Sequence, residues 1–163
     1  MPNMRYVWKS ALLGLGVSVF LIACGDDPQI AGDGRSLCGD ETRADTFVVG
    51  MEKPTFGDNF SVRLMDTEVE GNTVPPDRGH NVWTFEILDS NRMRVQGAVV
   101  TLRPWMPDHG HGTTPLVMEA VETDGVYSFG PFDLFMGGFW EFGVHVEAAE
   151  QADDTKFGFC LEG

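Results

Sequence analysis

The feature that most constrains the fold is an alternation of apolar and polar residues with a period of two. It is clearest in Val82–Leu88 and in Phe139–Val146. A period of two places every second side chain on the same face of an extended strand, so each segment has one face suited to a core. The spacing of three to four residues that marks an amphipathic helix is absent over any useful length. The chain is therefore predicted to be all-β.

Turn-forming Gly, Pro, Asn and Asp residues divide this pattern into seven or eight short strands, which is typical of an antiparallel β-sandwich. The alternation also predicts which side chains of the third, fourth and seventh strands face the core. The predicted strands are Thr46–Met51, Phe60–Asp66, Val82–Leu88, Ala98–Arg103, Leu116–Glu122, Val126–Phe129, Phe139–Val146 and Thr155–Leu161. The predicted core residues are Trp83, Phe85, Ile87, Ala98, Val100, Leu102, Trp140, Phe142, Val144 and Val146.

The first 23 residues have the parts of a secretory signal peptide. Two basic residues precede the apolar run Ala11–Ala23, which at ~1.5 Å per residue is too short to cross a hydrocarbon core of about 30 Å. Its end, Leu21-Ile22-Ala23-Cys24, resembles the lipobox of bacterial lipoproteins. The resemblance implies a signal peptide over residues 1–23 and lipidation of Cys24, which would anchor the protein to a membrane of the cell envelope, facing the periplasm. Gly25 favours the outer membrane by the sorting rule of enteric bacteria.

Residues 24–43 are predicted to form a lipidated tether, because they have almost no periodic apolar content. Residues 44–163 then form one domain. The chain has 25 acidic and 11 basic residues, and the predicted leader contains two of the basic ones and none of the acidic ones. The remaining chain has 9 basic and 25 acidic residues, a formal net charge of −16. This charge repels phosphates and excludes nucleic acid as a partner. The expected partners are a membrane, through Cys24, and a protein of the cell envelope.

Two cysteines remain when the lipidated one is set aside, Cys38 and Cys160. Exported proteins fold in an oxidising compartment, so a disulfide between them is predicted. It would join the first and last segments of the domain. A metal site that uses one of these thiolates is the alternative, although neither cysteine has a second ligand type at a suitable spacing.

Two of the four histidines, His109 and His111, lie in the Gly-rich segment Trp105–Thr113, and Met106 lies three residues before the first of them. Imidazole and thioether ligands suit copper better than calcium or magnesium. The segment is also consistent with an ordinary loop whose histidines cap or form hydrogen bonds. The other two histidines, His80 and His145, are predicted to be surface residues.

The block Val99–Gly112, followed by Asp124–Phe129 and Leu134–Phe142, resembles the YtkA-like and FixH-like group of small exported or membrane-tethered domains. It has their strand, their Met-Pro-x-His-Gly-His-Gly loop, a Gly-x-Tyr strand and a Met-x-Gly-x-Trp turn. Gly137 departs from the proline that often follows Met136. The segment Thr46–Leu88 and the cysteines lie outside the resemblance. It implies an immunoglobulin-like β-sandwich and, in some members, an association with copper handling or cytochrome oxidase maturation.

The resemblance adds Met136 as a fourth possible ligand, because its turn would meet the histidine loop if both lie at one end of the sandwich. Met106, His109, His111 and Met136 would then form a mixed nitrogen and sulfur set that favours Cu(I). Met136 is also suited to plug the end of the core, as flexible methionines do.

Three classes of function remain to be compared. No serine-hydrolase elbow, phosphate loop, Cys-x-x-Cys or His-Glu-x-x-His motif is present in the sequence, so an enzyme is not expected. A copper-binding carrier or metallochaperone follows from the loop and the resemblance. A structural or protein-interaction module without bound metal is the alternative, and Gly97–Leu102 with Thr123–Phe129 also resembles carboxypeptidase-regulatory and transthyretin-like sandwiches, which are mostly such modules.

Overall fold

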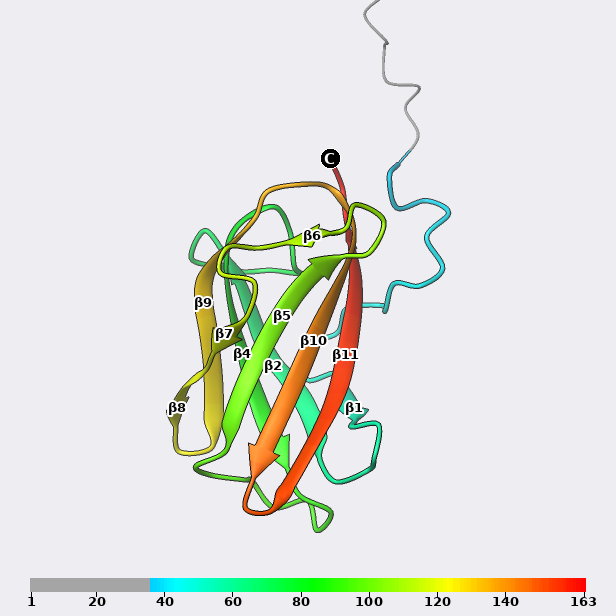
Figure 1. Cartoon of the computed structure of the whole chain (residues 1–163). Coiled ribbons are helices and arrows are strands. Elements are labelled where there is room, and N and C mark those ends of the chain that lie inside the picture. Colours follow the sequence, from blue (N-terminus) through cyan, green and yellow to red (C-terminus); the bar gives the residue numbers. More distant parts are fainter. Residues whose placement is uncertain (1–35) are drawn as a thin grey trace, which may run out of the picture. The chain divides into compact units, whose positions relative to one another are not determined.

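A computed structural model describes residues 36–163, and in this part of the chain all regular elements are β-strands (Figure 1). The predicted signal peptide and the lipidation site at Cys24 lie outside the described residues. Among the described residues, none forms a helix that is long and apolar enough to cross a membrane. The strands are β1 (Glu52–Pro54), β2 (Ser61–Val69), β3 (Asn72–Thr73), β4 (Gly79–Leu88), β5 (Val99–Met106), β6 (His111–Gly112), β7 (Met118–Glu119), β8 (Val121–Thr123), β9 (Val126–Leu134), β10 (Gly138–Ala148) and β11 (Gln151–Leu161).

The strands form two antiparallel sheets that face each other across one core (Figure 1). One sheet has the order β1-β2-β4-β9-β8, with β3 beside β2, and the other has the order β11-β10-β5-β6, with β7 beside β5. The orders β2-β4-β9-β8 and β11-β10-β5 are those of the A-B-E-D and G-F-C sheets of an immunoglobulin domain. The predicted immunoglobulin-like antiparallel β-sandwich is confirmed.

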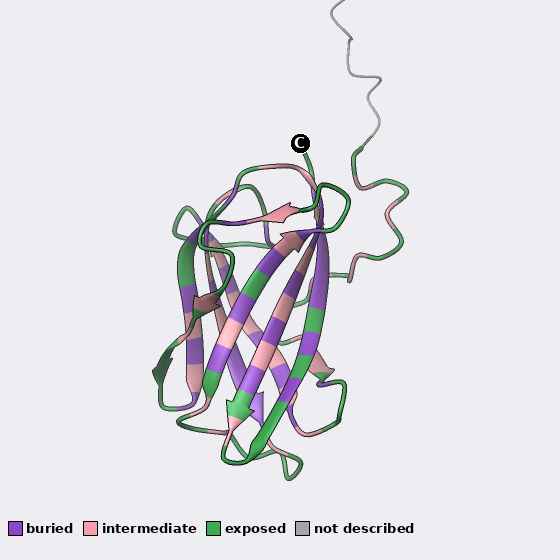
Figure 2. Ribbon diagram, in the orientation of Figure 1, coloured by how far each residue is buried: buried purple, intermediate pink, exposed green. Residues whose placement is uncertain are grey.

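The predicted inward faces form the core, and Figure 2 shows buried residues alternating with intermediate or exposed ones along β5 and β10. Trp83 lies at the centre and is 0% exposed. Its ring centre is 4.1 Å from that of Phe142 in the opposite sheet, and Phe132 and Phe159 contact it edge-on. Nine of the ten predicted core residues are buried, and Ala98 is partly buried beside them.

Two of the predicted strands were wrong in detail. Thr46–Met51 is not a strand, because Met51 N–H bonds to Val48 O and turns the chain, and the edge strand β1 begins only at Glu52. Leu116–Glu122 is divided into β7, which pairs with β5, and β8, which pairs with β9, so the chain crosses between the sheets at Ala120. The count of eleven strands exceeds the predicted seven or eight because five strands have only two or three residues.

The predicted disulfide is present, and it joins Cys38 to Cys160 in β11 across 122 positions of the sequence. Residues 36–43, which belong to the segment predicted as a tether, are thereby attached to the sandwich. Leu37 N–H also bonds to the Glu162 carboxylate at 3.1 Å, and Asp45 N–H bonds to Gly158 O at 2.7 Å. The start of the described chain is therefore held against the last strand.

One buried carboxylate, that of Asp153, organises the loop between β1 and β2. It accepts hydrogen bonds from Thr55 Oγ1 at 2.6 Å, from Gly57 N–H and from the backbone and side-chain N–H groups of Asn59. The Thr55 hydroxyl lowers the pKa of Asp153 most, and with the backbone donors it outweighs desolvation, which gives a value of about 2. The folded protein therefore favours the ionised form of Asp153.

The ionised carboxylate of Asp153 is expected to stabilise the folded protein until the pH falls well below ~4. Because the folded pKa lies below the ordinary value near 4, the stabilisation is complete above pH ~4 and is lost as the pH falls toward ~2. The difference in denaturation midpoint between the wild type and Asp153→Asn should therefore be largest near neutral pH and shrink across this window. Asp58→Asn, in the same loop, is the control, because the Asp58 carboxylate accepts no hydrogen bond from residues 36–163. A constant difference for Asp153→Asn would contradict the expectation.

Candidate metal centre

The histidine segment forms a tight hairpin at one end of the sandwich (Figure 1). Strand β5 ends at Met106, a four-residue turn follows, and β6 returns so that His111 pairs with Met106. The N–H groups of His109 and Gly110 both bond to Met106 O, at 3.2 and 2.9 Å. Gly110 has φ +69°, which a glycine adopts without strain. The hairpin presents His109 at its exposed tip and His111 on the returning strand.

The side chain of His111 is half-buried and lies against three aromatic rings. Phe135 stacks on it with ring centres 5.4 Å apart, and Trp140 lies edge-on at 6.4 Å. The ring of His109 is 5.7 Å away. His111 Nδ1 is buried and has no hydrogen-bond partner among residues 36–163. Buried polar atoms nearly always have a hydrogen-bond partner, so this unpaired nitrogen is unusual and is a candidate ligand atom.

The two methionines lie at the same end of the sandwich. Met106 is 0% exposed, and its Cε lies 3.1 Å from the position that a Cβ on Gly138 would take, at the start of β10. Met136 lies in the turn between β9 and β10, where it packs partly buried against the core and its carbonyl accepts a hydrogen bond from Trp140 Nε1 at 3.0 Å. The turn with Met136 thus lies at the end that carries the histidine hairpin, as a common site requires. The contact of Met136 with the core also agrees with its alternative interpretation as a plug.

A charged group lies beside the exposed histidine. Asp108 directly precedes His109, and the guanidinium of Arg43 donates to both of its carboxylate oxygens, at 2.9 and 2.6 Å. These hydrogen bonds lower the pKa of Asp108. The hairpin tip is therefore tied to the N-terminal segment, a contact that the sequence pattern did not indicate.

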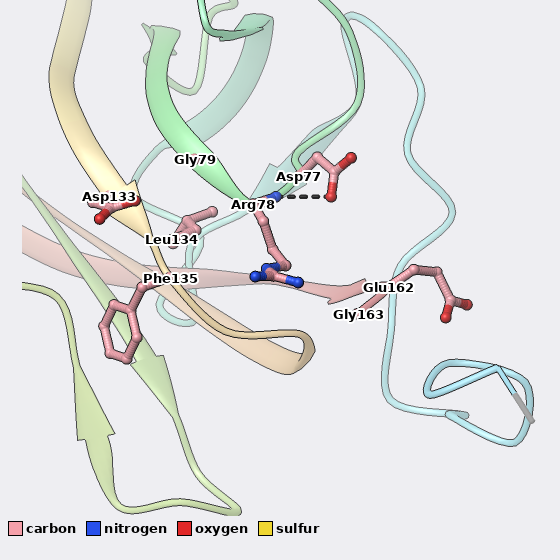
Figure 3. A pocket seen from close by; sticks show the side chains of 8 residues that line it. All are labelled: Asp77, Arg78, Gly79, Asp133, Leu134, Phe135, Glu162 and Gly163. Carbon is pink, nitrogen blue, oxygen red and sulfur yellow. Dashed lines mark hydrogen bonds between the residues drawn. The ribbon is translucent and has the colours of Figure 1, made fainter. Parts of the chain in front are cut away.

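Phe135 also borders a shallow hollow of about 510 Å³ at this end of the molecule (Figure 3). In Figure 3, Arg78 lies between Phe135 on one side and Glu162 on the other. Phe135 is 47% exposed, so the ring that covers one face of His111 is itself reached by solvent. Its contact with His111 was not predicted, because it depends on how two separate connections meet at this end of the sandwich.

The ligand types present limit what this end can hold. Within residues 36–163, no three His, Cys, Asp or Glu side chains gather in a way that could hold a metal ion. The imidazoles of His109 and His111 and the thioethers of Met106 and Met136 lie at this end, and these donor types suit copper better than calcium or magnesium.

A family model described as YtkA-like matches residues 62–145, just over half of the chain. The chain belongs to the YtkA-like family. No curated protein and no solved structure gives a significant match.

The YtkA-like region extends further than the sequence motifs indicated. The motifs begin at Val99, whereas the family match begins at residue 62 and so includes β2 and β4. It contains Met106, His109, His111 and Met136, and it excludes both cysteines and Arg43. The disulfide and the segment that it fixes are thus additions of this chain to the part that the family model covers.

The remaining histidines of the YtkA-like domain lie at the surface, as predicted. His80 is exposed at the start of β4. His145 lies on the outer face of β10, where its Nδ1 is 2.9 Å from the Asp154 carboxylate. Both are suitable controls for the histidines of the hairpin.

Proposed function

We propose that this YtkA-like protein is an exported lipoprotein, anchored to a membrane of the cell envelope, that binds one copper ion and acts as a carrier or metallochaperone. The proposed ligands are Met106, His109, His111 and Met136. Bound copper would supply a soft Lewis-acid centre that is passed to another protein. The chain's own residues hold and shield the ion, and no catalytic role is proposed.

The observation that carries the proposal is the unpaired Nδ1 of His111. A buried polar atom without a partner costs about 1–3 kcal/mol, and the cost disappears when a ligand or ion supplies the missing interaction. The rings of Phe135 and Trp140 pack against the same imidazole. The donor types at this end, imidazole and thioether, prefer Cu(I). His109, at the exposed tip, would be the first ligand to meet an incoming ion.

The anchor at Cys24 is proposed from the lipobox and the signal-peptide pattern. Residues 25–35 would join it to the segment that the disulfide holds, and eleven residues span at most about 40 Å when extended. The site would thus remain near the membrane surface, facing the periplasm, with the outer membrane favoured over the inner one.

Copper binding is tested by competition between the full chain, purified in detergent, and a chromogenic Cu(I) chelator under anaerobic conditions. Cys24→Ser is used as the background so that an unlipidated thiol cannot contribute. We expect one Cu(I) per chain, and His109→Ala with His111→Ala should lower the affinity more than about 100-fold, because loss of an outer partner alone can cost about 10–100-fold. The thermal midpoint without copper should be nearly unchanged.

The matched control is His80→Ala with His145→Ala, which removes the same number of imidazoles from the surface and should leave copper uptake unchanged. Negligible uptake by all three proteins would reject the copper carrier in favour of a metal-free interaction module. Met136→Leu separates the two interpretations of that residue. If Met136 is a ligand, the substitution should weaken Cu(I) binding, and if it only plugs the core, Cu(I) binding should be unchanged.

A further inference from the structure

The N-terminal strap, which we define as residues 36–45, is fixed at both of its ends. Near one end, the Cys38–Cys160 disulfide and the hydrogen bond from Leu37 N–H to Glu162 attach it to the end of β11. At the other end, Asp45 and Gly158 exchange two hydrogen bonds, at 2.7 and 2.8 Å. The residues between these attachments are therefore held close to the end of the sandwich that carries the hairpin.

Arg43 lies in the fixed part of the strap and reaches the hairpin. Its guanidinium donates to both oxygens of Asp108, at 2.9 and 2.6 Å, and to both oxygens of Glu41, at 2.9 and 2.6 Å. The guanidinium carbon is 4.2 Å from the ring centre of Phe139. Contact on an aromatic face and paired carboxylate bonds together fix the orientation of the planar group. Arg43 thus connects two carboxylates and the start of β10.

We propose that Arg43 is a positioning residue for the hairpin: by holding Asp108, it orders the tip that carries His109 and so raises the affinity for copper. This inference rests on the proposed function. Without Arg43, the tip is held by the two backbone hydrogen bonds to Met106 O. If the tip becomes ordered only when the ion binds, the entropy cost of that ordering weakens copper binding. If the tip is already ordered, binding does not carry this cost.

The size of the effect follows from the exposure of the pair. The side chains of Arg43 and Asp108 are 45% and 52% exposed, so the contact is screened by water and contributes little to global stability. We expect Arg43→Ala to weaken Cu(I) binding by up to about fivefold, the upper range for an exposed ion pair. Arg43→Lys should restore only part of this loss, because an ammonium cannot form the paired contact.

The test has a readout that needs no metal. Hydrogen–deuterium exchange of the peptide spanning residues 105–112 in the copper-free full chain should become faster in Arg43→Ala, because the backbone bonds of His109 and Gly110 open more often. Asp108→Asn should have the same effect, and the double variant should exchange no faster than either single one, since both remove one interaction. Additive effects would overturn the proposed contact.

Arg92→Ala is the matched control. Arg92 is another exposed arginine on a carboxylate, with Nη2 2.9 Å from Glu52, and it lies in the β4–β5 connection, at the other end of β5 from the hairpin. It should lower the thermal midpoint about as little as Arg43→Ala while leaving copper affinity and exchange of residues 105–112 unchanged. Equal effects of both variants would overturn the inference. If the wild type binds no copper, the proposed function and the affinity effect fail together, while the exchange measurement still decides whether Arg43 orders the hairpin.

Discussion

Trp83→Ala is expected to lower the free energy of unfolding by about 3–5 kcal/mol, which is the usual cost of removing a large aromatic side chain from a core. The indole is fully buried, and aromatic rings from both sheets surround it. Its removal leaves a cavity between the sheets and also takes away the donor at 3.3 Å from Asn81 Oδ1, a buried acceptor. Equilibrium unfolding in urea, followed by fluorescence and circular dichroism, measures the change.

Trp105→Ala is the matched substitution at a less buried position. Trp105 lies on the outer side of β5, where the guanidinium carbon of Arg103 is 4.8 Å from its ring centre. A cation on an exposed aromatic face contributes about 0.5–1 kcal/mol, so the loss should be several times smaller than at Trp83. Equal losses at the two positions would contradict the expectation that the fully buried indole of Trp83 contributes more to stability than the outward one of Trp105.

Replacement of both Cys38 and Cys160 by serine is expected to be the other large change, at about 2–5 kcal/mol. The bond closes a loop across 122 positions, so its loss greatly increases the freedom of the unfolded chain. In the folded protein, the loss of the disulfide also releases one end of the N-terminal strap. Chemical denaturation of the variant should match that of the wild type after treatment with a thiol reductant. An unfolding midpoint that neither change alters would show that the cross-link contributes no stability.

The alternation in β4 and β10 made the core predictable, because a strand buried on one side repeats every two residues whatever it packs against. The edge of the fold was not predictable in this way. Val48 and Val49 have the composition of a strand, but both are exposed, and the chain there turns toward β1. Whether such a segment becomes a strand depends on the partner available at the sheet edge, which a local pattern does not contain.

The candidate site was predictable to a similar degree. The histidine pair is visible in the sequence because only Gly110 separates His109 from His111, but the segment was expected to be a loop, and its return as β6 was not predicted. The contact between Arg43 and Asp108 joins positions 65 residues apart, and the stacking of Phe135 on His111 depends on how two connections meet at one end of the sandwich. Neither contact has a periodic or local signal.

The short strands and the segment before β2 have a consequence for self-association. In the second sheet, β6 and β7 cover the outer side of β5, while Asp45, Pro54 and Phe56 bond to the outer side of β11. Unpaired backbone groups along a sheet margin invite another chain to add a strand, which is a common route to aggregation. Within residues 36–163, this covering leaves little bare backbone at the margins of that sheet through which two molecules could join.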